Sequence, residues 1–121
     1  MRKAKKIQVG SVIQFPWYQF EPSRSGWNGW MFRAGIVEKL YVNSKGRKCA
    51  TVRYCSNIAD RYQMLPNTEA TKNIYQEYLF EFNVDLEQKN YKRCRALEKE
   101  GQKVCWGCDT ALLVNHGIIT E

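Results

Sequence analysis

The chain has 121 residues, of which 44% are hydrophobic and 26% are charged, and its formal net charge is +7. This length suits one compact domain, and the composition excludes a disordered or fibrous protein. No apolar run approaches the about 20 residues of a membrane-spanning helix, and no apolar segment follows the basic start as in a secretory signal. We therefore expect a cytoplasmic protein with no membrane partner.

Positive charge is concentrated in the first half of the chain. Residues 1–59 hold eleven Lys and Arg against two acids, a net +9, whereas residues 60–121 hold eight against ten acids, a net −2. The basic half also holds a dense aromatic run between Phe15 and Phe32. Cations attract phosphate and aromatic rings stack on bases, so this combination favours a nucleic acid as the partner.

The first thirty residues predict one strand between two irregular segments. Residues 1–6 (MRKAKK) are expected to form a disordered basic tail, because four cations leave little to bury. Alternating apolar residues predict a strand over 11–15, which Pro16 ends because proline has no N–H for the sheet. Residues 16–29 are rich in Pro, Ser, Gly and Asn and predict a long aromatic loop, a length typical of functional loops.

The clearest local structure is an antiparallel hairpin. Residues 30–42 alternate as a strand, the turn follows at 43–46, and residues 47–56 pair back as the second strand. Gly35 inside the first strand predicts a bulge or a bend. One face of that strand is expected to hold Trp30, Phe32, Ala34, Ile36, Leu40 and Val42, and the other Met31, Arg33, Gly35, Val37, Lys39 and Tyr41.

The middle of the chain is less regular. Residues 57–67 fit a short helical turn that ends at Pro66. Residues 74–84 keep a period of two over a β-favouring composition, which predicts a further strand. A helix over 69–82 is the alternative.

The last third of the chain predicts two helices. Asp85 is a good N-cap for a helix over 86–100, and Gly101 follows that helix as a terminator. Asp109 is expected to be the N-cap of a second helix, which ends at His116.

These elements predict a single α+β domain over residues 7–121, β-rich over 7–84 and helical over 85–121. The expected architecture is a small, strongly bent antiparallel sheet or barrel followed by a helical element. Its strand order resembles the small SH3-like or Tudor-like barrels, over roughly the first sixty residues. The matching segments are residues 10–13 (GSVI), 35–37 (GIV) and 42–46 (VNSKG).

The hairpin and the aromatic loop supply the candidate binding residues. Cations of the hairpin and tail would contact phosphates, and Trp17, Tyr18 or Trp27 would stack on bases, while Trp30 is expected in the core. The alternatives are a solvated sheet face and a set of rings that closes one end of a barrel; the scarcity of acids, Glu38 alone, favours binding. The candidate nucleic-acid-binding residues are Lys3, Lys5, Lys6, Trp17, Tyr18, Arg24, Trp27, Arg33, Lys39, Lys45, Arg47, Lys48 and Arg53.

Four residues form a possible zinc set. Cys105 and Cys108 have the C-x-x-C spacing, and Cys94 and His116 would complete a Cys₃His shell. A structural zinc site normally shows two close ligand pairs, and this chain has one, so we expect no cofactor and keep zinc as the alternative. The odd number of cysteines and the absence of a secretion signal favour reduced thiols.

The chain shows no catalytic motif. His116 is the sole histidine, no nucleophile motif surrounds it, and there is no Gly-rich phosphate loop. We predict a non-catalytic nucleic-acid-binding protein, for DNA or RNA, that uses the basic hairpin and the aromatic loop. The alternative is a small protein-interaction module or inhibitor, of the phage or mobile-element type, that docks on a nucleic-acid-handling enzyme, since Arg and aromatic residues also anchor protein partners.

Overall fold

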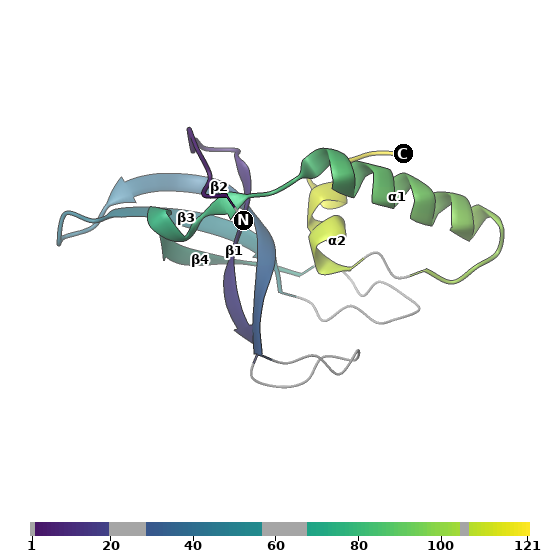
Figure 1. Cartoon of the computed structure of the whole chain (residues 1–121), viewed down its shortest axis with the longest axis horizontal. Helices are drawn as coiled ribbons and strands as arrows, with labels where there is room; N and C mark the ends of the chain where they lie inside the picture. Colours follow the sequence, from purple (N-terminus) through teal and green to yellow (C-terminus); the bar gives the residue numbers. More distant parts are fainter. Residues whose placement is uncertain (1, 20–28, 57–67, 105–106) are drawn as a thin grey trace.

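The structure is a computed structural model that describes residues 2–19, 29–56, 68–104 and 107–121. Within these ranges, five antiparallel strands form one sheet in the order β4-β3-β2-β1-β5, accompanied by two α-helices (Figure 1). The α+β class is thus confirmed. The elements are β1 (Val12–Gln19), β2 (Gly29–Val42), β3 (Lys48–Cys55), β4 (Glu69–Tyr75), the 3-10 helix η1 (Gln76–Tyr78), β5 (Phe80–Glu81), α1 (Val84–Lys99) and α2 (Cys108–Asn115).

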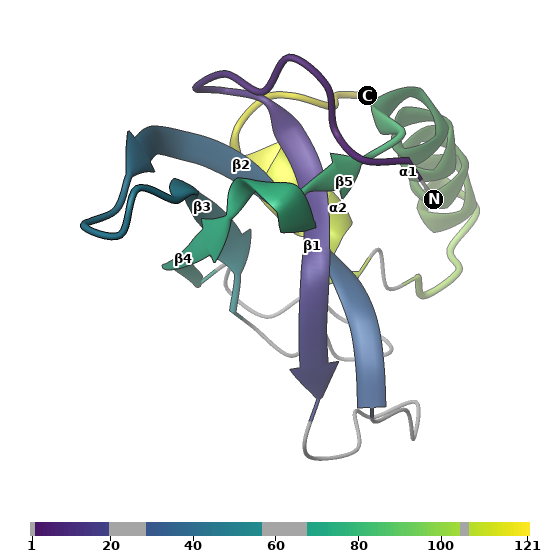
Figure 2. The same cartoon turned by 60° about the vertical axis from the view of Figure 1, so that its left-hand side comes forward.

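The sheet is bent but not closed into a barrel. β4 and β5 lie at its two ends and do not pair with each other in the described part of the chain. β2 runs beside β1 and then bends away to pair with β3 (Figures 1 and 2). The SH3-like or Tudor-like barrel is therefore not confirmed, because the pair of strands that would close it is missing.

The irregularity of β2 lies at Glu38 and not at Gly35. Val37 and Lys39 pair with adjacent residues of β3, so Glu38 is the extra residue of a bulge. One extra residue reverses which side chains face the core. Leu40 therefore packs in the same core as Val37, whereas simple alternation placed the two on opposite faces.

Gly35 instead allows a close approach between strands. A Cβ at this position would lie 3.1 Å from Cε1 of Phe15 and 3.3 Å from the carbonyl oxygen of Arg53. Phe15 is fully buried at the centre of the first core. This core consists of the buried residues Ile13, Phe15, Val37, Ala50, Val52 and Leu79.

β1 continues through Pro16, where a loop was expected. Pro16 pairs with Phe32 of β2, whereas β5 pairs with β1 only at Ile13 and Gln14. Pro16 therefore lies on an edge stretch of β1, where no second strand requires its missing N–H. Residues 17–19 and 29 of the predicted loop likewise belong to β1 and β2, and residues 20–28 lie outside the described ranges.

The strand predicted over 74–84 was wrong. β4 ends near its start, η1 turns the chain, and β5 contains only two residues. Leu79 is fully buried and Tyr78 is 46% exposed, the reverse of the expected alternation. The turn of 3-10 helix interrupts the period of two, and the alternation of apolar and polar residues in the sequence does not indicate this turn.

The N-terminal segment lies along β5. The N–H of Ala4 donates to the carbonyl of Leu79 at 2.9 Å, and the N–H of Glu81 donates to the carbonyl of Arg2 at 2.9 Å. Ala4 also packs against the first core. The described part of residues 1–6 is thus held against the sheet, in contrast with the disordered tail that the sequence predicted.

The helices build a second core beside the sheet. Figure 1 shows α2 next to the sheet and α1 extending away from it. Tyr91, Leu113 and Ile119 are buried between them. α1 begins slightly earlier than predicted, because Asn83 and not Asp85 is its N-cap and accepts a hydrogen bond from the backbone of the first turn. None of the helices in the described ranges has the length and apolar character needed to cross a membrane.

We predict that Gly35→Ala lowers the free energy of unfolding by roughly 1 kcal/mol or more, because neither the buried Phe15 ring nor the backbone of β3 can move freely from the added methyl. Urea denaturation measures the effect. In a double-mutant cycle, Phe15→Leu is expected to cancel part of this loss by making room. Equal stability of Gly35→Ala and wild type would contradict the packing described.

Candidate binding groove

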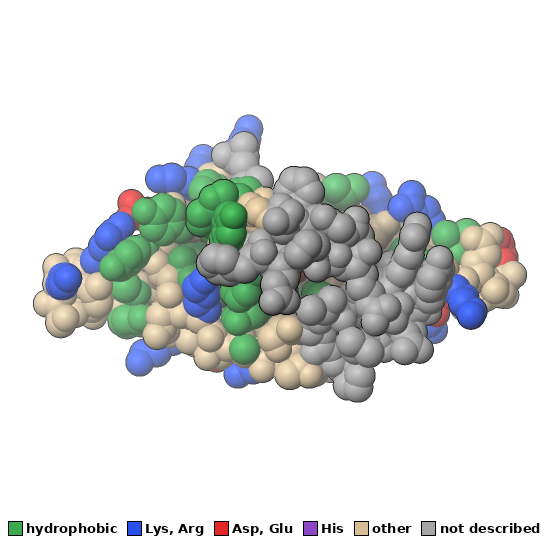
Figure 3. Space-filling model, turned by 90° about the horizontal axis from the view of Figure 1, so that it is seen from below, with side chains coloured by type: hydrophobic (Ala, Val, Ile, Leu, Met, Phe, Trp, Pro, Cys, Tyr) green, Lys and Arg blue, Asp and Glu red, His purple; other side chains and the backbone are tan. Residues whose placement is uncertain are grey.

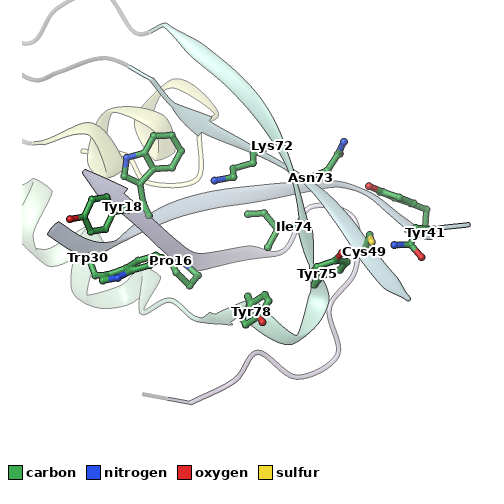
Figure 4. Close-up of a pocket in the computed structure, with 12 residues that line it drawn as sticks. Pro16, Tyr18, Trp30, Tyr41, Cys49, Lys72, Asn73, Ile74, Tyr75 and Tyr78 are labelled. Carbon is green, nitrogen blue, oxygen red and sulfur yellow. The ribbon is translucent and has the colours of Figure 1, made fainter. Parts of the chain in front are cut away.

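A groove of about 850 Å³ lies at the opening of the sheet. β1 and the start of β2 form one side, and β4 with η1 forms the other, while the β2–β3 hairpin contributes the far end (Figure 4). The groove exists because the sheet bends without closing. Its described lining is Pro16, Trp17, Tyr18, Trp30, Tyr41, Asn43, Cys49, Lys72, Asn73, Ile74, Tyr75 and Tyr78.

The lining is aromatic and contains no described carboxylate. Six of its side chains are aromatic, and one, Lys72, is cationic. Seen from below, hydrophobic and basic side chains share the visible surface of the strands, and few acidic ones appear (Figure 3). The aromatic members are Trp17, Tyr18, Trp30, Tyr41, Tyr75 and Tyr78.

Trp30 and Tyr18 form an exposed ring pair at one end of the groove. The two residues are partners in the β1–β2 register, and their ring centroids lie 5.3 Å apart in a T-shaped arrangement. Trp30 is 68% exposed and Tyr18 is 41% exposed. The prediction of a core Trp30 was wrong, because the start of β2 extends beyond the end of β3 and, among the described strands, pairs with β1 alone.

Trp17 is half-buried, in contrast with the exposed platform that was expected. Its ring centroid lies 6.4 Å from that of Phe15 and 5.1 Å from that of Tyr54. Two cations contact the same ring: Cζ of Arg33 lies 4.6 Å from its centroid and Nζ of Lys72 lies 4.8 Å from it. Such contacts contribute about 0.5–1 kcal/mol at exposed sites. Trp17 is thus fixed against the core on one side and reached by Lys72 from β4.

Arg33 lies on the core side of the sheet, so its expected place on an outer face was wrong. It pairs in register with Phe15, and Nη1 donates to the carbonyl of Cys55 at 2.9 Å. Its Nε is buried and has no hydrogen-bond partner within the described ranges. Val37, which alternation places on the same face as Arg33, is buried in the first core, so the face expected to be outer packs inward before the bulge.

Two further hairpin arginines form ion pairs, one with an acid of η1 and the other with acids of β2 and β4. Arg47 forms an ion pair with Glu77 of η1, and Arg53 pairs with Glu38 and lies 3.6 Å from Glu69 of β4. The acids of η1 and β4 thus lie beside the hairpin in the fold, although they are distant from it in the sequence. The expectation of an almost acid-free basic face is therefore corrected.

None of the remaining predicted cations that the structure describes belongs to the groove lining. Lys45 and Lys48 are exposed on the hairpin, and Lys39 lies with Nζ 5.4 Å from the ring centroid of Tyr41. Near the N-terminus, the exposed Lys3, Lys5 and Lys6 belong to the segment that approaches β5 and are not part of the groove lining. Arg24 and Trp27 lie outside the described residues.

Sequence reasoning missed the β4 side of the groove. Lys72, Tyr75 and Tyr78 were not considered as binding residues, and neither was Tyr41 of β2. The β-favouring run from Thr71 onward was the available signal for a strand. Its position opposite β1 depends on the bend of the sheet and cannot be read from local sequence.

Asp109 holds α2 to β2. The N-cap of α2 is Gly107, and Oδ1 of Asp109 instead accepts the N–H of Ala34 at 3.0 Å. The register between β2 and β3 begins at Ile36, so this N–H belongs to the part of β2 that precedes the pairing with β3. Burial raises the pKa of Asp109, and Glu87 adds to this rise, whereas the Ala34 hydrogen bond and the charge of Arg33 oppose it.

The C-terminal end of α2 is tied to β4. Nε2 of His116 lies 2.8 Å from Oε1 of Glu69, and the side-chain amide of Asn115 donates to Oε2 of Glu69 at 2.6 Å. Burial acts to raise the pKa of Glu69, but these two hydrogen bonds and the nearby Arg53 outweigh it and lower the pKa. His116 is thus committed to a carboxylate contact.

The zinc hypothesis stays a prediction. Among the described residues, no three His, Cys, Asp or Glu side chains gather as metal ligands would. Cys94 is buried in α1, and Cys108 begins α2. Cys105, the other half of the C-x-x-C pair, lies outside the described residues.

No protein-family model, curated protein or solved structure matches this chain. The function is therefore argued from the groove and its surroundings.

We predict that Asp109→Asn stabilises the protein at neutral pH. The raised pKa means that the folded state binds the Asp109 proton more tightly than the unfolded state. The stabilisation that comes from binding this proton is fully present below a pH of about 3.9, the pKa of Asp in the unfolded state. It is lost as the pH rises through the higher pKa of the folded state. Asparagine keeps an acceptor for Ala34 without the charge, so the gain over wild type should grow across that window.

Urea denaturation of both proteins at several pH values measures this difference. Asp85→Asn, at an exposed position of α1, controls for the loss of one negative charge. A stability difference between Asp109→Asn and wild type that does not change with pH would contradict the assignment.

Proposed function

We propose that this protein binds single-stranded nucleic acid, without catalysis, in the groove between β1 and β4. The observation that carries the proposal is a groove whose described lining holds six aromatic rings and one cation but no carboxylate. Stacking of a base on an aromatic side chain contributes about 1–3 kcal/mol and tolerates any base. Three of the rings are open to solvent and are therefore accessible as platforms: Tyr18, Trp30 and Tyr78.

Phosphate contacts would come from cations inside and beside the groove. Lys72 lies within it, and Lys45 and Lys48 are exposed on the hairpin whose residues form the far end. Arg47 already covers the ring of Tyr75, with Cζ 3.5 Å from the centroid, while it pairs with Glu77. A small number of phosphate contacts gives a moderate salt dependence, with a slope of about −0.7 for each contact on a single strand.

The geometry favours a single strand over a duplex. Rings that line a groove can contact bases only where those bases are unpaired and turned outward. Duplex binding relies on a broad cationic surface, and the ion pairs of Arg47 and Arg53 weaken such a surface on the hairpin. The aromatic groove, more than the basic hairpin, is therefore the proposed interface.

The second candidate is the protein-interaction module. An aromatic groove bordered by an edge stretch of β1 also suits an extended peptide, because proline-rich segments dock between aromatic rings and edge strands accept a further strand. Such a module could act as an inhibitor or accessory factor on a nucleic-acid-handling enzyme. The net positive charge and the acid-free lining favour the nucleic acid.

We predict that Trp30→Ala weakens binding of a single-stranded oligonucleotide by roughly 5- to 150-fold, which corresponds to the loss of one stacking platform. Fluorescence polarisation with labelled single- and double-stranded DNA and RNA, at about 50 and about 250 mM salt, measures the affinity. The mutation should leave the fold intact, since Trp30 is largely exposed.

Leu86→Ala is the matched control, because Leu86 is 63% exposed and lies on α1, away from the groove. It should bind as wild type does. Absence of binding by wild type to all four nucleic acids at the lower salt would overturn the proposed function. Tight binding of a proline-rich peptide under the same conditions would then favour the second candidate.

A further inference from the structure

The contact between Lys72 and Trp17 crosses the opening of the sheet. Lys72 belongs to β4 and Trp17 to β1, and these strands are separated by β3 and β2 in the sheet order. Nζ of Lys72 nevertheless lies 4.8 Å from the centroid of the Trp17 ring. Figure 4 shows the Lys72 side chain extending into the groove. The ammonium group therefore rests on Trp17, a ring that packs against the first core.

The two cations on Trp17 differ in how firmly they are held. Arg33 donates to the carbonyl of Cys55 and also lies 6.0 Å from the ring of Tyr54, so its guanidinium is fixed by several partners. Lys72 is exposed, and in the described part of the chain no carboxylate lies within ion-pair distance of it. An anion that binds the ammonium group more strongly than the Trp17 ring does can therefore replace this contact.

We infer that Lys72 makes the groove selective for a base that carries a phosphate. In the free protein the ammonium covers Trp17, and in the complex a base stacks on the ring while the ammonium moves to the neighbouring phosphate. A charge-assisted contact with phosphate is stronger than an exposed contact with a ring face, so the exchange favours the complex. This inference rests on the proposed function and adds the ligand class, a nucleotide unit as opposed to an uncharged ring or a proline-rich peptide.

The test compares Lys72→Met with Lys92→Met. Methionine keeps an unbranched chain but removes the charge, and Lys92 is an exposed lysine of α1 that changes the net charge equally. With a labelled single-stranded oligonucleotide, the plot of log affinity against log salt should be shallower by about 0.7 for Lys72→Met. It should keep nearly the wild-type slope for Lys92→Met. Equal slopes for the two variants would overturn the inference.

A second measurement follows the side chain itself. The methylene protons of Lys72 in the free protein should be shifted upfield by the ring current of Trp17, and Trp17→Leu assigns this signal by abolishing it. Saturation of the wild type with the oligonucleotide should move the signal toward the position of a solvent-exposed lysine. A signal that stays upfield and unchanged in the saturated complex would contradict the exchange.

The two proposals fail in different ways. If wild type binds no single strand, both the proposed function and the role of Lys72 are overturned. If wild type binds, and Trp30→Ala weakens that binding, but Lys72→Met behaves like Lys92→Met, the proposed function stands and only the role of Lys72 is rejected.

Discussion

The close packing of the Phe15 ring on Gly35 is the contact on which the rest of the structure depends. The ring fills the space that a side chain at position 35 would occupy, which allows β1 to lie tightly on β2 where the sheet begins to bend. The same ring packs against Trp17 and Tyr54. One glycine thus positions the core and, through Trp17, the floor of the groove.

The groove follows from a bend that stops short of closure. The bulge at Glu38 redirects β2, so β3 and β4 curve back toward β1, and the space left between β4 and β1 is lined by aromatic rings. In a closed barrel these rings would be core. The open sheet leaves them lining the groove beside Lys72. Outside the groove, α2 is anchored to β2 through Asp109 and to β4 through Glu69.

Local patterns predicted local structure well. The hairpin was confirmed because strand alternation and its turn are encoded by neighbours: Oδ1 of Asn43 accepts the backbone N–H groups of Lys45 and Arg47. Both helices were also found, with starts one or two residues earlier. A bulge or bend was expected at Gly35 but lies at Glu38, because any residue can form one, and this shift reversed the expected direction of the side chains that follow it, such as Leu40. The ion pairs of the hairpin and the Lys72–Trp17 contact join segments that are distant in the sequence. The β1 side of the groove could therefore be predicted, and the β4 side could not.

Titration of ¹⁵N-labelled protein with a short single-stranded oligonucleotide, followed by amide chemical shifts, tests whether the aromatic groove is the binding surface. We expect shifts concentrated on Tyr18, Trp30 and the stretch from Lys72 to Tyr78, with little change in α1. Shifts confined to the hairpin tip or the N-terminal segment, with the groove amides unchanged, would contradict binding in the groove. They would indicate that the basic surface alone binds the oligonucleotide.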